Sequence, residues 1–190
     1  MEVFFINRND AKVSSWDFGK TYQYFIYPYS SDYKKRNFLV RISMATQETE
    51  EISEYTNLEG FTRFLTMLEN DAHLSHSSSG EKILHELSDI DVFDGGEKTF
   101  AKGRVTDFNM MLKNGIKGDM AYIRADGLIK PEYKSIALLS INGKASIKYK
   151  DNFLRFSNKY DMIVLKEVDS DLNLQIDLNG DILLRMDFDV

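Results

Sequence analysis

Two arginines interrupt runs of otherwise apolar residues and are the side chains of this sequence best suited to hold an anion. Arg41 lies in Phe-Leu-Val-Arg-Ile-Ser-Met-Ala, and Arg63 lies in Gly-Phe-Thr-Arg-Phe-Leu. A guanidinium inside a core needs a partner, so each arginine either reaches the surface or lines a polar cavity. In a strand, Arg41 would share its face with the small residues Ser43 and Ala45, which suits a barrel interior that holds an anion. The pattern alone leaves both arrangements open.

Three further positions could contribute to such a cavity. Asn109 carries an amide that an apolar strand does not need, although an asparagine at a sheet edge or turn would look the same. Trp16 is the only tryptophan of the chain, and it could be a core residue, a lid or a stacking surface. Gly19 allows close backbone approach, and Thr21 supplies a hydroxyl group.

Metal and nucleophile chemistry find little support in this sequence. It has three histidines and no cysteine, and the spacing of His73 and His76 places their rings on opposite faces of a strand. No serine lies in a Gly-x-Ser-x-Gly elbow, and no phosphate-binding glycine loop is present. The acid pairs Asp89/Asp91 and Asp187/Asp189 are interpreted as exposed carboxylates at strand edges. We therefore predict no metal, no cofactor and no catalytic residue.

Bulk properties narrow the class of protein further. The chain has 190 residues, enough for one domain or two small β units, and a net charge of −6. An acidic chain whose only basic cluster is Lys34-Lys35-Arg36, interpreted as a solvated loop, is a poor nucleic-acid binder. No apolar run is long enough for a signal peptide or a membrane span. We expect a cytoplasmic protein without nucleic-acid or membrane partners.

Apolar residues alternate with a period of two in several windows, including Phe38–Met44, Leu172–Leu178 and Ile182–Val190. Asn142-Gly143 and Asn179-Gly180 each join two such windows, and this dipeptide is typical of β-hairpins. The segment from Ile52 to Leu58 could form one helical turn. The pattern as a whole predicts an all-β fold with little helix.

Five short motifs, in order, resemble those of the HutD/Ves family of metal-free, cupin-like proteins. The resemblance covers roughly residues 10–115. It departs from the family pattern at Asp17, Phe18 and Lys20. The matching residues are Trp16, Gly19 and Thr21; Arg41, Ser43 and Ala45; Ser53, Gly60 and Arg63; Phe93, Gly95 and Glu97; and Asp107, Asn109 and Met111.

The resemblance implies a bicupin-like β-sandwich or barrel of the RmlC-like jelly-roll type. We expect one HutD/Ves-like unit with an N-terminal lobe at 1–118 and a C-terminal lobe at 119–190. It also implies a pocket in the N-terminal lobe in which Arg41, Arg63, Asn109, Ser43 and Thr21 supply polar contacts and Trp16 and Phe93 form walls.

Three functions are compatible with these residues. The first is non-catalytic binding of a small anionic metabolite that carries a carboxylate, by a monomer or homodimer. The second is a metal-free isomerase or lyase, for which Asp107 is the only acid within the motifs. The third is a protein-interaction module. Members of the family are associated with bacterial histidine utilisation or with stress response, so the resemblance favours the first function.

Overall fold

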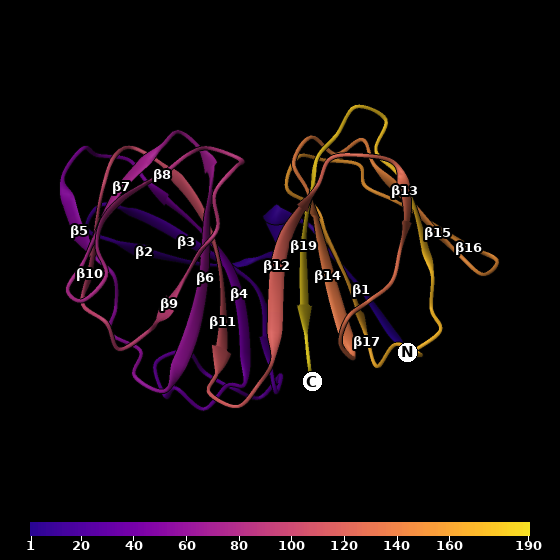
Figure 1. Cartoon of the computed structure of the whole chain (residues 1–190), viewed down its shortest axis with the longest axis horizontal. Helices are drawn as coiled ribbons and strands as arrows, with labels where there is room; N and C mark the ends of the chain where they lie inside the picture. Colours follow the sequence, from indigo (N-terminus) through magenta and orange to yellow (C-terminus); the bar gives the residue numbers. More distant parts are fainter. The chain divides into compact units, whose positions relative to one another are not determined.

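The computed structural model describes residues 1–190 and consists almost entirely of antiparallel strands. The chain divides into two compact units (Figure 1). We call Lys12–Gly115 the N-terminal unit, and Ile116–Val190 together with Met1–Ala11 the C-terminal unit. The single helical element is the 3-10 turn η1 (Arg8–Asp10), so the structure contains no helix with the length and apolar character that crossing a membrane requires. The predicted all-β fold with little helix is confirmed.

The N-terminal unit consists of two antiparallel sheets that share an apolar cluster. Leu65 and Met67 from one sheet pack with Leu74 and Ala101 from the other. The six-stranded sheet has the order β2 (Lys12–Trp16), β3 (Gly19–Tyr27), β4 (Val40–Gln47), β11 (Thr106–Lys113), β6 (Phe61–Glu69) and β9 (Asp91–Asp94). The four-stranded sheet has the order β5 (Ile52–Glu54), β10 (Thr99–Lys102), β7 (Ala72–His76) and β8 (Gly80–Leu84).

The C-terminal unit repeats this two-sheet plan. Its five-stranded sheet has the order β1 (Glu2–Ile6), β17 (Met162–Lys166), β14 (Ser135–Ser140), β19 (Leu183–Phe188) and β12 (Gly118–Ile123). Its four-stranded sheet has the order β13 (Gly127–Ile129), β18 (Leu174–Asp177), β15 (Ser146–Tyr149) and β16 (Asn152–Arg155).

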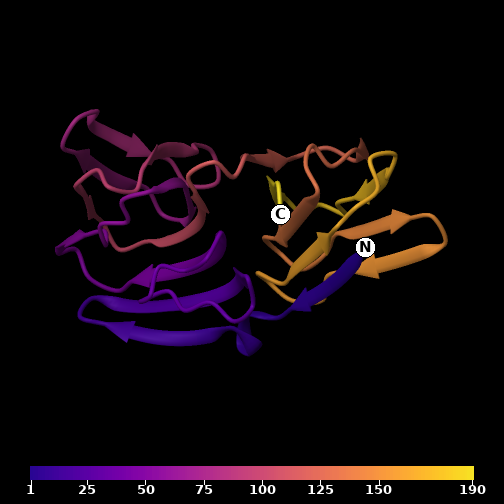
Figure 2. The same ribbon diagram turned by 90° about the horizontal axis from the view of Figure 1, so that it is seen from below.

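The first strand of the chain belongs to the C-terminal unit. Figure 2 shows β1, in indigo, beside the orange strands of that unit, and in the pairing of β1 with β17 Phe4 lies opposite Val164. The N-terminal unit is therefore an insertion after Ala11, and it ends at Gly115. The sequence did not predict that β1 joins the C-terminal unit, because pairing between strands that are distant in the chain produces no local sequence pattern.

The two Asn-Gly turns are corners between sheets, so the hairpin prediction was wrong. Asn142-Gly143 leads from β14 in one sheet to β15 in the other, and Asn179-Gly180 leads from β18 back to β19. The Asp181 carboxylate ties both corners together, since it accepts backbone N–H groups of Asn142 and Lys144. The dipeptide reports the left-handed backbone of a tight turn, here with Gly143 at φ 72° and Gly180 at φ 77°, and does not report which strands pair.

The central strands of the N-terminal unit are buried on both faces. In β4, Val40, Ile42 and Met44 are fully buried on one face, as the alternation predicts. The opposite face carries Arg41 and Ser43, which are also buried. The segment from Ile52 to Leu58, for which a helical turn was considered, instead begins with strand β5, paired with β10, and continues without regular structure. A buried polar face on a central strand requires partners for its polar groups, and these lie in the cavity described next.

Candidate functional site

A cavity of about 350 Å³ lies within the N-terminal unit. Its volume is at the lower end of the range typical of small-molecule pockets. Both sheets and the segment that follows β5 contribute to its wall. The lining residues are Ser14, Ser15, Trp16, Thr21, Tyr33, Arg41, Ser43, Ala45, Gln47, Ser53, Glu54, Tyr55, Thr56, Arg63, Asp107, Asn109 and Met111.

Strand register arranges the wall formed by the six-stranded sheet in ordered rows. Met111, Asn109 and Asp107 on β11 face the cavity because residues two apart in a strand point the same way. Their neighbours on β4 and β6 complete three cross-strand rows. Along β11 these rows are Arg41–Met111–Arg63, then Ser43–Asn109–Leu65, then Ala45–Asp107–Met67.

Arg41 is held by neutral groups. Its Nε donates to Gln23 Oε1 at 3.0 Å, and its Nη1 donates to Ser43 Oγ at 3.0 Å. The guanidinium also lies over the Tyr33 ring, 4.1 Å from the ring centroid. Burial lowers the pKa of Arg41 to about 10, which leaves it charged at neutral pH. Arg41 therefore brings a positioned cation into the cavity.

Arg63 lies in an aromatic slot. Its guanidinium carbon is 4.6 Å from the Tyr55 ring centroid and 5.3 Å from that of Phe93. Its one hydrogen bond is a long one, from Nη1 to the Thr56 carbonyl at 3.5 Å, and its buried Nε has no partner. Burial lowers the pKa of Arg63 as well. The slot fixes the cation and leaves most of its donors unused.

Neither of these buried arginines forms an ion pair with a carboxylate of the protein. The residues are 5% and 3% exposed, so water cannot supply full compensation. A buried cation without a counter-ion costs several kcal/mol. This arrangement is expected where an anionic ligand completes the charge balance.

Asn109 lies on β11, in the row between the row of the two arginines and the row of Asp107. Its side chain makes no hydrogen bond within the protein. The residue is 3% exposed and its Oδ1 is fully buried. Buried amides are nearly always hydrogen-bonded, so the free amide is a second group that a ligand would satisfy.

Asp107 is the acid of the cavity. Its Oδ2 accepts the Tyr55 hydroxyl at 3.2 Å. Burial raises the pKa of Asp107 to about 7, against the opposing influence of Arg63, and burial and Asp107 together raise the pKa of Tyr55. A carboxyl group that titrates near neutrality inside a cavity can accept or hold a proton. The prediction of site residues did not include Asp107, although it shares the strand face of Asn109.

Six of the seven predicted ligand residues line this cavity: Arg41, Arg63, Asn109, Ser43, Thr21 and Trp16. Phe93 does not, which corrects its expected role as a wall. It lies opposite Arg63 in the β6–β9 pairing and packs against the guanidinium from behind. Whether the six residues bind a ligand stays a prediction.

Other lining residues were not predicted as ligands. Gln47 and Ser53 use their polar atoms within the protein. Ser53 Oγ donates to Gln47 Oε1 at 2.6 Å, and Gln47 Nε2 donates to the Glu51 carbonyl at 2.7 Å. Tyr33 and Tyr55 cover the two arginines. The tyrosines come from irregular segments, so no strand periodicity could have indicated their position.

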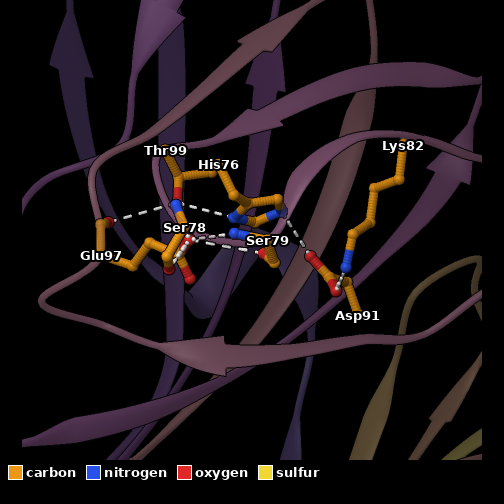
Figure 3. A network of polar contacts seen from close by, with 7 residues as sticks. All are labelled: His76, Ser78, Ser79, Lys82, Asp91, Glu97 and Thr99. Carbon is orange, nitrogen blue, oxygen red and sulfur yellow. Dashed lines mark hydrogen bonds and ion pairs between the residues drawn. The ribbon is translucent and has the colours of Figure 1, made fainter.

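A second polar network lies behind Phe93 and is drawn in Figure 3. The buried His76 ring contacts Thr99 Oγ1 through Nδ1 at 3.0 Å and Asp91 Oδ2 through Nε2 at 2.9 Å, and Lys82 Nζ lies 2.5 Å from the other Asp91 oxygen. The Phe93 ring meets the His76 ring edge-on at 4.9 Å. The network therefore holds the Phe93 ring, which in turn packs against the Arg63 guanidinium.

Two of the carboxylates interpreted as exposed are in fact buried. Asp91 is 4% exposed and Asp187 is 2% exposed, and each pairs with a basic side chain, Asp91 with Lys82 and Asp187 with Arg185. A buried ionised carboxylate needs such a partner. The partners lie on other strands or two residues away, and spacing alone did not identify them.

No group of three or more His, Cys, Asp or Glu side chains is placed to hold a metal ion. His73 is exposed on the outer face of β7, whereas His76 points into the unit. The remaining histidine, His85, contacts Asp71 at 2.9 Å on the surface.

A broader concavity of about 1100 Å³ covers the outer face of the four-stranded sheet. Ile52 and Ile83 are exposed there, on either side of the neighbouring pair Lys102 and His73. It differs from the buried cavity because its side chains are solvated, and it holds no buried group that lacks a partner.

Comparison with known proteins identifies the relatives of this chain. The sequence profile of the HutD family matches residues 8–184. A search of curated protein sequences finds no match.

Solved structures agree in fold. A conserved protein of unknown function from Pseudomonas aeruginosa PAO1 has a TM-score of 0.85 at 13% identity, and HutD from Pseudomonas fluorescens SBW25 has a TM-score of 0.78 at 14% identity, each with full coverage of both chains. A nickel(II) complex of the bacterial pirin YhhW from Escherichia coli has a TM-score of 0.66 at 9% identity, again with full coverage of both chains. The fold is thus that of bicupin-type β-sandwich proteins.

Proposed function

Because this chain belongs to the HutD family, and because its buried arginines lack counter-ions, we propose that it binds a small metabolite that carries a carboxylate. The observation that carries the proposal is Arg63, whose guanidinium lies between two aromatic rings with its Nε unpartnered. The fork of donors on a guanidinium matches the two oxygens of a carboxylate. We expect the role to be non-catalytic.

The size of the cavity supports a metabolite over a macromolecular ligand. About 350 Å³ accommodates a small organic acid and excludes a folded partner. Two charge-assisted contacts of about 1.5–3 kcal/mol each amount to about 3–6 kcal/mol, which corresponds to a dissociation constant between about 6 mM and about 40 μM. We further propose a cytoplasmic monomer or homodimer, and histidine utilisation is one pathway that could supply the acid.

Titration with pentanoate tests the proposal. Trp16 is the only tryptophan and lines the cavity, so its fluorescence reports binding directly. Arg41→Ala should weaken binding by about 2 kcal/mol, because the carboxylate is left partly unpaired. Arg41→Lys should restore little, since a point charge cannot replace the fork.

The matched control is Arg155→Ala, which removes an exposed arginine from β16 of the C-terminal unit. It should leave the titration unchanged. Equal binding by wild type and a folded Arg41→Ala protein would contradict the proposal, and circular dichroism and thermal melting establish that each variant folds.

A metal-free isomerase or lyase is the second candidate, favoured by one observation. Asp107 is a cavity acid whose pKa of about 7 suits general acid–base catalysis. Turnover of a bound acid that disappears in Asp107→Asn would favour this function over simple binding.

A further inference from the structure

The cavity is electrically asymmetric along β11. The row at Met111 carries both arginines, and the row at Asp107 carries the acid. Met111 and Asp107 are four residues apart, which corresponds to about 13 Å along a strand. Arg41 leans from its own row toward the next, since it donates to Ser43. The separation between a carboxylate held by the arginines and Asp107 is therefore shorter, on the order of 7 Å.

Each end of this axis lacks a charged partner from the protein. Asp107 forms no ion pair, and its one side-chain contact is the neutral Tyr55 hydroxyl. The arginines have only neutral partners. The arginines and Asp107 thus attract each other across the cavity, which opposes the rise in the Asp107 pKa that burial causes, but no ion pair joins them.

Asn109 occupies the middle of the axis, in the row between the arginines and the acid. Its free amide presents an acceptor and two donors. The Asn109 side chain can therefore contact the middle of a ligand that extends from the arginines to Asp107, whether that part of the ligand is polar or unsubstituted.

Building on the proposed carboxylate-binding function, we propose that the ligand is zwitterionic. Its carboxylate lies between Arg41 and Arg63, and an ammonium or other cationic N–H group at its opposite end donates to Asp107. The ligand lies along β11 and passes Asn109. The chemical class is that of ω-amino acids and related acids with a cationic nitrogen several bonds from the carboxylate.

Two other classes of acid fit the axis less well. A dicarboxylate of the same length would place its second anion against Asp107, and repulsion between like charges opposes that. A plain alkyl acid would leave the Asp107 carboxyl buried under a hydrocarbon chain with Tyr55 as its only partner. Of these three classes, a ligand with a cationic end is the one that satisfies both ends of the cavity.

Three acids of equal chain length separate these classes: 5-aminopentanoate, pentanoate and glutarate. Titration followed by Trp16 fluorescence and by calorimetry should show that 5-aminopentanoate binds about tenfold more tightly than pentanoate, because it adds one charge-assisted hydrogen bond. Glutarate should bind more weakly than pentanoate. Glutarate binding as tightly as 5-aminopentanoate would overturn the proposal.

The substitution Asp107→Asn tests whether Asp107 is the residue that binds the cationic end of the ligand. The amide keeps an acceptor for Tyr55 but removes the charge, so the ratio of 5-aminopentanoate to pentanoate affinity should fall to near one. Asp119→Asn is the charge-matched control, because Asp119 is exposed on β12 of the C-terminal unit, and it should keep the wild-type ratio. An unchanged ratio in Asp107→Asn overturns the assignment.

The three acids also distinguish failure of this inference from failure of the proposed function. Pentanoate binding that depends on Arg41, with no preference for the amino acid, would retain the carboxylate site and contradict the zwitterion. No binding of any of the three acids would contradict both.

Discussion

The two units of this protein share a two-sheet antiparallel plan but fill it differently. The interior of the C-terminal unit contains a continuous cluster of buried apolar side chains, which includes Ile136, Leu138 and Ile163. The interior of the N-terminal unit has a smaller apolar cluster at one part and a polar cavity at another. The same architecture therefore encloses an apolar cluster in one unit and a polar cavity in the other.

Their arginines make the contrast specific. Arg185 of the C-terminal unit pairs through Nε with Asp187, and its Nη2 donates to the Lys130 carbonyl at 2.7 Å. Arg41 and Arg63 of the N-terminal unit have no carboxylate partner. Where the protein needs a cation only for its own structure, it supplies the counter-ion. The absence of one beside Arg41 and Arg63 is the feature on which the proposed carboxylate site rests.

The largest expected effect comes from removing one carboxylate charge in each unit. Asp187→Asn should destabilise the protein by about 3 kcal/mol, because it removes the buried carboxylate that pairs with Arg185 and leaves the exposed carboxylate of Glu132 as its only ion-pair partner. Asp107→Asn should change stability by less than about 1 kcal/mol at pH 8, since burial already disfavours the ionised form of Asp107 and the amide still accepts from Tyr55. Urea unfolding of both variants measures the difference.

Equal losses in the two variants would mean that Asp107 is a structural counter-ion like Asp187. The distinction between the units would then fail.

Adding volume should also separate the units, with an intermediate effect. Ala145 is fully buried within the apolar cluster, so Ala145→Leu should overpack it and cost about 1–3 kcal/mol. Ala45 lines the cavity, so Ala45→Leu should fit with little loss of stability while occupying ligand space. Thermal melting and pentanoate titration should therefore give opposite results for the two substitutions.

If Ala45→Leu destabilises the protein as much as Ala145→Leu does, the space beside Ala45 is not a usable cavity. If it leaves pentanoate binding intact, the ligand lies elsewhere.

Much of the fold could be predicted from local patterns. Alternation in the windows Phe38–Met44 and Ile182–Val190 indicated the strands observed at Val40–Gln47 and Leu183–Phe188, because one face of each carries mainly apolar side chains. The same rules could not assign β1 to the C-terminal unit, or show that Asn142-Gly143 and Asn179-Gly180 change sheets. Those features depend on pairing between distant segments, whereas a dipeptide reports only its own backbone.

The residues of the candidate site also differ in how far the sequence predicts them. Arg41 and Arg63 could be identified because a cation within an apolar strand is costly, and that cost is visible in sequence. Asp107 was identified as the only acid within the motifs, but it was assigned to the enzyme alternative and not to the ligand site. Tyr33 and Tyr55 lie in irregular segments, where no periodicity shows which way a ring points. Phe93 could not be placed behind Arg63 without the register of β6 and β9.

The smallest expected effect is a dependence of binding on pH that only the N-terminal unit should show. The pKa of Asp107 is raised by burial to about 7, above its unfolded value of about 3.9. The folded state thus holds a proton that the unfolded state releases, and this contribution to stability is lost as pH rises from about 4 to about 7. For pentanoate, ionisation of Asp107 adds a like charge to the cavity, so affinity should fall several-fold between pH 6 and pH 8.

For 5-aminopentanoate the same ionisation creates the partner of the ammonium group, so affinity should rise over that interval. Opposite slopes for two acids in one cavity cannot come from titration of a distant group, which would move both in the same direction. Asp107→Asn should flatten both profiles, and Asp187→Asn should alter neither slope in protein that remains folded. Parallel slopes in the wild type would show that Asp107 does not face the ligand.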